Sequence, residues 1–337
     1  MEKRNPMAYK PIFPLLVSMA FPPMISMLIQ SLYNIVDSIF VAQLGEEALT
    51  AVSLIYPLQN LSLAFSCGVG IALNAIIARH LGAHNDKEAS FVATQGIVMT
   101  LLHSILFVGI GLFLIEPFLT LFTQNQDVIQ YGIEYGFIVI TFTFSTFIHL
   151  AIEKMFQACG NMIIPMIMQM VGAIVNIILD PIFIFGLDLG VKGAAFATVI
   201  SQFISALWTL RFLTGKKTIL KIKKQYLSLK VKYVTKIISL GMAGFMMAIT
   251  NSIVTIVCNA TLQQYGGDLY IAIMTIINSI REVASLPGQG MANACQPVLG
   301  FNYGAKEYAR VLQGIKFVTF NGTINDADSL AGNNGIS

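Results

Sequence analysis

The residues of this chain that are best suited to chemistry are carboxylates inside apolar segments. Asp180 lies in the stretch VGAIVNIILDPIFIFGLDLG, and Asp37 lies in LIQSLYNIVDSIFVAQLG. A carboxylate in hydrocarbon costs about 2.5–3.5 kcal/mol even on a lenient insertion scale, so such a residue is usually functional and rarely alone. Asp37 and Asp180 are therefore predicted to form a functional pair.

Asn176 and Thr198 extend this pair into a cluster of oxygen atoms. Asn176 is four residues before Asp180, so both project from one face of the same helix. Thr198 lies just over one turn into the next apolar run, and at ~1.5 Å per residue all of these positions reach a similar depth. Carboxylate, amide and hydroxyl oxygens can hold a small hard cation or share a proton. We therefore predict that Asp37, Asn176, Asp180 and Thr198 bind a coupling ion, H⁺ or Na⁺.

A structural role remains an alternative for the two carboxylates. Asp180 precedes Pro181, where it could cap a broken helix, and Asp37 could bond to a neighbouring helix.

Further polar residues inside apolar runs are weaker candidates. They could line a transport pathway, although hydrogen bonds between helices explain them equally well. These residues are Gln30, Tyr33, Asn34, Arg281 and Glu282, the last two being expected as a buried couple.

The elements that must position these residues are membrane helices. The chain is 55% hydrophobic and 11% charged, whereas globular proteins carry about 25% charged residues. A spanning helix needs about 20 mostly apolar residues, and eight such runs are present. They cover residues 12–44, 48–78, 91–115, 132–152, 163–187, 193–213, 235–262 and 269–299. The predicted fold class is an all-α polytopic membrane protein.

Basic residues orient the predicted helices. Every even-numbered loop carries Lys or Arg, with Lys154 assigned to the fourth, whereas the odd-numbered loops hold almost none. Because cytoplasmic loops hold the excess of Lys and Arg, we predict a cytoplasmic N-terminus. The segment 214–236 contains eight lysines and no acidic residue, which suits contact with anionic lipid better than nucleic acid.

A weak internal repeat indicates two halves of similar structure. Gly68-Val-Gly70 recurs as Gly288-Gln-Gly290, and Gly82-Ala83 recurs as Gly304-Ala305, at offsets of 220 and 222 residues. Parallel repeats of this kind are typical of transporters. The predicted division is a six-helix bundle at 1–213, a basic cytoplasmic linker at 214–236, a partial second bundle at 237–320 and a polar, disordered tail at 321–337.

Several segments together resemble the multidrug and toxic compound extrusion (MATE) family. They are SLYNIVDSIFVAQLGEEALTAVSL, ARHLGAHN, NIILDPIFIFGLDLGVKGAAFAT and QPVLGFNYGAKEYAR. The resemblance implies two six-helix bundles around a central cleft and a secondary antiporter in a bacterial inner membrane. Such a transporter exports organic cations, including drugs, in exchange for H⁺ or Na⁺, and Asp37, Asn176, Asp180 and Thr198 match the family's coupling-ion residues. Here the second bundle is expected to hold two spans and a stub of a third.

Two alternatives stay open beside the antiporter. One is a flippase for lipid-linked saccharides, which would need a strongly cationic cleft; the other is a truncated fragment that does not transport. An enzyme is not expected, because no HExxH, GxSxG or P-loop pattern is present. Four scattered cysteines and four histidines show no metal spacing, so no cofactor is expected. The sequence does not specify an oligomeric state.

Overall fold

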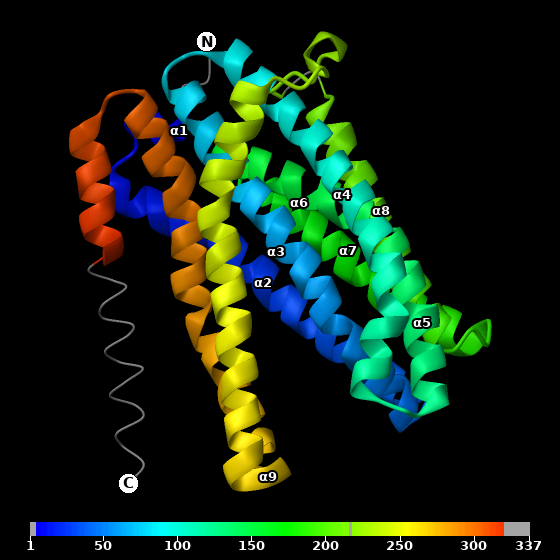
Figure 1. Ribbon diagram of the computed structural model, residues 1–337. Helices are drawn as coiled ribbons and strands as arrows, with labels where there is room; N and C mark the ends of the chain where they lie inside the picture. Colours follow the sequence, from blue (N-terminus) through cyan, green and yellow to red (C-terminus); the bar gives the residue numbers. More distant parts are fainter. Residues whose placement is uncertain (1–4, 216–217, 320–337) are drawn as a thin grey trace, which may run out of the picture.

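A computed structural model describes residues 5–215 and 218–319, and many side chains between 251 and 282 are not described (Figure 1). The elements, in chain order, are α1 (Pro6–Tyr9), α2 (Ile12–Ala42), α3 (Glu46–Gly82), α4 (Asp86–Phe122), α5 (Gln126–Thr141), α6 (Thr143–Ala158), α7 (Ile163–Pro181), the π-helix η1 (Ile182–Gly186), α8 (Val191–Leu213), the 3₁₀-helix η2 (Lys224–Tyr226) and α9 (Val231–Gly304). Residues 308–319 form one more helix.

The long helices are apolar enough to cross a membrane. Among the described residues, six helices meet this criterion, and α5 with α6, bent by 45° at their junction, make a seventh span. Backbone groups in hydrocarbon must be satisfied within the segment, which a helix does by itself. The structure thus confirms the predicted all-α polytopic fold.

The last two predicted spans lie together in α9. Figure 1 shows this helix reversing direction near its middle, with its first part in yellow and its second part in orange. The first part contains a span at Val231–Thr250. The part of the run 269–299 up to residue 282 consists mostly of residues whose side chains are not described, and the predicted tail 321–337 lies outside the described residues.

Two glycines of the repeat bring α3 and α9 into backbone contact. A Cβ atom at Gly82 would overlap the carbonyl oxygen of Phe301, and one at Gly304 would overlap that of Arg79. Residues 82 and 304 are 222 positions apart, and so are 79 and 301. The same contact is therefore made twice, once in each direction.

A second pair of contacts follows the same rule. A Cβ at Gly68 would lie 2.7 Å from the carbonyl oxygen of Gly241, and one at Gly290 would lie 2.9 Å from that of Ala20. Gly290 is 222 residues after Gly68, and Gly241 is 221 after Ala20. The packing therefore repeats at an offset of 221–222 residues and relates α2 and α3 to the two parts of α9. It makes Gly290 the equivalent of Gly68, so the sequence pairing of Gly68 with Gly288 was wrong by two residues.

The basic linker is attached to the start of α4. The Gln95 side chain donates to the carbonyl oxygen of Ser228 (2.9 Å) and accepts from the backbone amide of Lys230 (2.9 Å). The backbone amide of Lys221 donates to Ser90 Oγ (3.0 Å), and Leu220 is fully buried. These contacts connect the linker to the helical bundle at its basic end.

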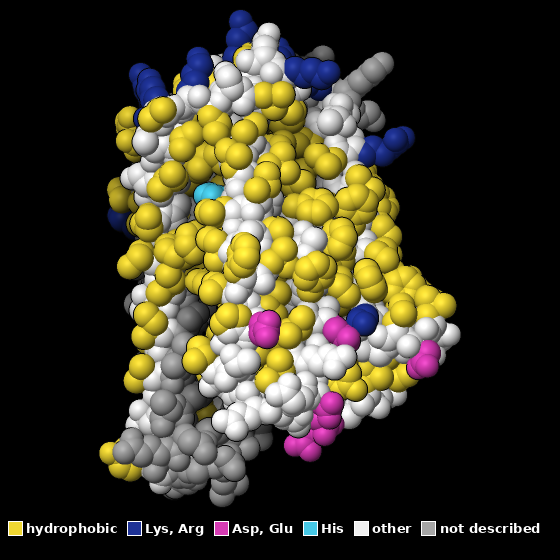
Figure 2. Space-filling view, turned by 45° about the vertical axis from the view of Figure 1, so that its right-hand side comes forward, with side chains coloured by type: hydrophobic (Ala, Val, Ile, Leu, Met, Phe, Trp, Pro, Cys, Tyr) yellow, Lys and Arg dark blue, Asp and Glu magenta, His cyan; other side chains and the backbone are white. Residues whose placement is uncertain are grey.

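Charged side chains separate along the long axis of the molecule. Figure 2 shows Lys and Arg gathered at one end, most Asp and Glu at the other, and hydrophobic side chains between them. At the acidic end, Lys192 pairs with Glu134 (3.0 Å). An apolar belt between two polar ends is the surface expected of a membrane protein.

The close helix crossing makes a first prediction. Gly82→Ala and Gly304→Ala should each lower the thermal unfolding temperature in detergent, because a Cβ there meets backbone that cannot turn aside. Overpacking typically costs about 1–3 kcal/mol. The matched control is Gly109→Ala on α4, where a Cβ meets nothing within 4 Å. Equal unfolding temperatures for all three variants would contradict the crossing.

Candidate functional site

Asp180 occupies the last regular turn of α7. Pro181 follows it and has no backbone N–H to donate, and the next five residues form the π-helix η1. Such π turns inside α-helices are rare and are found frequently at functional sites. Asp180 is completely buried, although a carboxyl group is among the side chains least often found there.

Asn176 joins three of the predicted site residues. Its Nδ2 atom donates to Asp180 Oδ1 (3.3 Å), one turn further along α7, and to Thr198 Oγ1 (3.5 Å) on α8. Asn176 is 1% exposed. The spacing argument for Asn176 and Asp180 therefore holds, and the packing of α8 against α7 adds Thr198.

Asp37 approaches this group from α2. Its carboxyl group lies within hydrogen-bonding reach of that of Asp180. Asp37 Oδ1, Asp180 Oδ2 and Asn176 Oδ1 are all buried, and none has a hydrogen-bond partner among the described residues. The structure thus brings the four predicted residues together and leaves three oxygen atoms without a donor.

This arrangement has a clear chemical consequence. Two adjacent carboxylates repel each other, and a shared proton or a bound cation relieves the repulsion. Carboxylate, amide and hydroxyl oxygens are also the donors that hard cations prefer. The geometry therefore suits the binding of H⁺ or Na⁺ as a transported ion. No cluster of three or more His, Cys, Asp or Glu side chains suited to a metal ion occurs among the described residues.

A polar cavity of about 110 Å³ adjoins the cluster, between α2, α3, α6, α7 and α8. Its lining comprises Gln30, Tyr33, Leu63, Thr146, His149, Leu150, Glu153, Gln169, Gly172, Ala173, Asn176, Ser201, Gln202 and Ser205. Asn176 belongs to both the cluster and the cavity wall. The cavity thus borders the cluster through Asn176.

The structure places some of the other sequence candidates at the cavity and others away from it. Gln30 and Tyr33 line the cavity, but Asn34 does not and is exposed on α2. Arg281 is exposed on α9, so the expected burial is not observed there. The side chain of Glu282 lies outside the described residues. Helical periodicity does not explain the first difference, because residues 33 and 34 both lie one turn after residue 30; the packing of α2 against its neighbours decides which of them faces the cavity.

Sequence reasoning missed the contribution of α6. Thr146, His149 and Glu153 follow one another at intervals of three and four residues and line one wall of the cavity. That spacing marks one face of a helix and could have identified them. The hydroxyl group of Thr146 also donates to Gln202 across the cavity.

Lys154 was placed in a loop by the sequence, and this was wrong. It belongs to α6 and is only 6% exposed. Its Nζ donates to Gln157 Oε1 (3.1 Å) and to Asn293 Oδ1 (3.2 Å) on α9, and it lies 3.7 Å from Glu153. The absence of a side chain at Gly70 leaves room for its stem. Partners of this kind allow a charge to be buried.

Known proteins show the same architecture. The chain is 26% identical over 308 residues to the multidrug export protein MepA of Staphylococcus haemolyticus, covering 91% of this chain and 68% of that protein. A MOP superfamily transporter from Pyrococcus furiosus superposes with a TM-score of 0.91 at 26% identity, covering 98% of this chain and 74% of that one.

An outward-facing multidrug resistance MATE transporter of the MOP superfamily gives the same TM-score, identity and coverage. This chain therefore spans roughly two thirds to three quarters of the length of the relatives it matches. The sequence model of the MatE family matches residues 22–182 and 243–323, which is more than half of the chain. Together with the helical fold and the buried polar cluster, this match shows that the chain is a multi-pass membrane protein of the MatE family.

Proposed function

We propose that this chain is an antiporter that exports organic cations in exchange for H⁺ or Na⁺. One observation carries the proposal: the carboxyl groups of Asp37 and Asp180 lie within hydrogen-bonding reach of each other, and each has a buried oxygen that lacks a donor among the described residues. Two buried carboxylates with no bound proton or cation cost free energy, and a bound cation lowers this cost. A purely structural pair would be expected to have its oxygens satisfied.

The coupling would act through α2. Pro22 and Pro23 are buried within this helix, about four turns before Asp37, and neither has a backbone N–H. The carbonyl oxygen of Pro22 accepts a hydrogen bond from Ser26 Oγ one turn later (3.1 Å), a contact that often accompanies a bend. Ion binding at Asp37 would draw the outer part of α2 toward α7, and the proline pair would absorb the change as a hinge.

The lining of the cavity favours cationic substrates. Glu153 is its one acidic member besides the adjoining carboxyl pair, and no Lys or Arg lines it. A lipid-linked saccharide carries pyrophosphate and would need cationic walls, so the flippase alternative lacks support here. MepA, one of the relatives, is named as a multidrug export protein. We extend this class of small organic substrates to the present chain.

The charge distribution completes the proposal. The basic linker and the basic ends of the helices would face the cytoplasm of a bacterial cell. The N-terminus would then be cytoplasmic, and the carboxyl pair would lie in the outer half of the membrane. Protons or sodium ions could reach it from outside while a substrate leaves.

The second prediction is that export depends on both carboxyl groups. The chain in liposomes should export a fluorescent organic cation when an inward H⁺ or Na⁺ gradient is imposed. Asp37→Asn and Asp180→Asn should each reduce this export to the level of protein-free liposomes, because neither can bind the ion as a pair. Asp188→Asn is the matched control, since Asp188 is exposed in a loop at a φ of 52°, which Asn also adopts readily. Export that persists in both site variants, or no export by the unaltered chain, would contradict the proposal.

The third prediction concerns stability and tests ion binding apart from transport. Proton uptake relieves the repulsion between the two carboxylates in the folded chain, whereas in the unfolded chain they lie apart and gain nothing from it. Lowering the pH from 8 to 6 should therefore raise the unfolding temperature. At pH 8, Asp37→Asn should be more stable than the unaltered chain, because its amide can donate to the unsatisfied oxygen of Asp180. A hydrogen bond to a charged group contributes about 1.5–3 kcal/mol.

The third prediction is tested by the change in unfolding temperature between pH 8 and pH 6 in two variants. Asp37→Asn should lose part of the rise, whereas Asp188→Asn should keep it. A rise of equal size in all three proteins would assign the effect to other carboxyl groups.

A further inference from the structure

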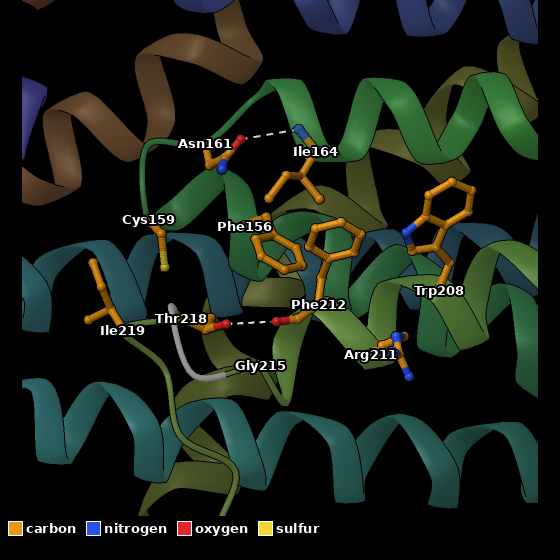
Figure 3. A pocket seen from close by; sticks show the side chains of 10 residues that line it. All are labelled: Phe156, Cys159, Asn161, Ile164, Trp208, Arg211, Phe212, Gly215, Thr218 and Ile219. Carbon is orange, nitrogen blue, oxygen red and sulfur yellow. Dashed lines mark hydrogen bonds between the residues drawn. The ribbon is translucent and has the colours of Figure 1, made fainter.

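A second, wider cavity lies at the basic end of the molecule and contains none of the ion-site residues. Its volume is about 750 Å³, within the range of about 300–1,000 Å³ that is usual for ligand pockets. It is formed by the end of α6, the connection to α7, the last two turns of α8 and the first described part of the linker (Figure 3). The antiporter mechanism makes no use of it.

One side of this groove is aromatic and open to the outside. Trp208 and Phe212 are one turn apart on α8, and their rings stack with centroids 6.3 Å apart and planes inclined by 19°. Trp208 is 39% exposed and Phe212 is 44% exposed. Phe156 on α6 and Ile164 on α7 extend the apolar wall, as Figure 3 shows. This surface suits an acyl chain.

Basic groups lie beside this aromatic wall, with Arg211 on the same helix between Trp208 and Phe212. Arg211 is exposed, and its guanidinium group has no hydrogen bond or ion pair with any described residue. The Nζ atom of Lys221 donates to the carbonyl oxygen of Gly215 (3.1 Å), which is one of the residues that line the groove. No Asp or Glu belongs to the lining. An arginine fork and an ammonium group at one rim suit a phosphate group.

The position of the groove decides between ligands. Tryptophan and basic side chains at the end of a membrane helix typically lie at the lipid–water boundary. Basic pockets between membrane helices on the cytoplasmic side bind the head groups of anionic lipids. We propose that this groove binds one anionic phospholipid, with an acyl chain on Trp208, Phe212 and Phe156 and its phosphate between Arg211 and Lys221. This proposal rests on the membrane insertion of the chain and is independent of its export activity.

The chain contains a built-in probe for this site, because Trp208 is its one tryptophan. The full chain is reconstituted in phosphatidylcholine vesicles that contain a small fraction of phosphatidylglycerol brominated on its acyl chains. A parallel sample contains the same fraction of brominated phosphatidylcholine. Bromine quenches tryptophan fluorescence at short range, so the comparison measures which lipid occupies the groove.

Brominated phosphatidylglycerol should quench Trp208 more strongly than brominated phosphatidylcholine. Two basic groups near the membrane surface should enrich the anionic lipid at the groove by roughly tenfold or more. The double variant Arg211→Gln, Lys221→Gln should abolish the difference while it keeps the same tryptophan emission and helical content. Lys87→Gln should retain the difference, because Lys87 is exposed at the start of α4 and does not line the groove.

Three results would overturn the proposal. Equal quenching by the two lipids would show that the groove does not select charge. An equal loss in the double variant and in Lys87→Gln would assign the selection to the general positive charge of this end. Removal of the difference by millimolar inorganic phosphate would identify the ligand as a free anion instead of a lipid.

Discussion

The structure depends on the contact between the carboxyl groups of Asp37 and Asp180. Both are held inside apolar helices, where a negative charge is poorly stabilised. Most polar groups inside the bundle have partners: Lys154 is bonded by Gln157 and Asn293, and Thr146 by Gln202. Asp37 and Asp180 each retain a buried oxygen without a donor among the described residues, as do a few neutral side chains such as Asn74, but only these two can carry a negative charge there. Two ionised carboxylates held this close would repel each other, and in the proposed function a proton or a cation relieves this repulsion.

The packing that maintains this pair is continuous with the packing between the repeated segments. α2 carries Asp37, contacts α7 at the site and contacts the second part of α9 near Gly290. α3 lies against both parts of α9 through glycines that allow backbones to touch. Helices in such close contact cannot slide past each other easily, so a displacement of α2 is expected to displace α9 as well. Asn293 and Lys154 add a polar link across the same boundary.

The two ends of the molecule carry different features. The acidic end lies on one side of the apolar belt, whereas the basic end carries the linker and the aromatic groove. Gln95 and Ser90 on α4 hold the linker by its backbone, which leaves most of its lysine side chains directed outward. The linker is therefore positioned to meet a lipid surface without entering the ion site.

The sequence by itself determined the membrane helices, the repeat and the pairing of Asn176 with Asp180. These features depend on the hydrophobicity summed over a run of residues and on helical spacing, and both are set by residues that are close in sequence. Only the tertiary structure decided that Asp37 meets Asp180, that residues 30 and 33 but not Asn34 face the cavity, and that Lys154 is buried with a partner on α9. The physical reason is that apolar length places a helix in the membrane without specifying its rotation. Which polar groups meet inside is decided by how helices distant in sequence pack against one another.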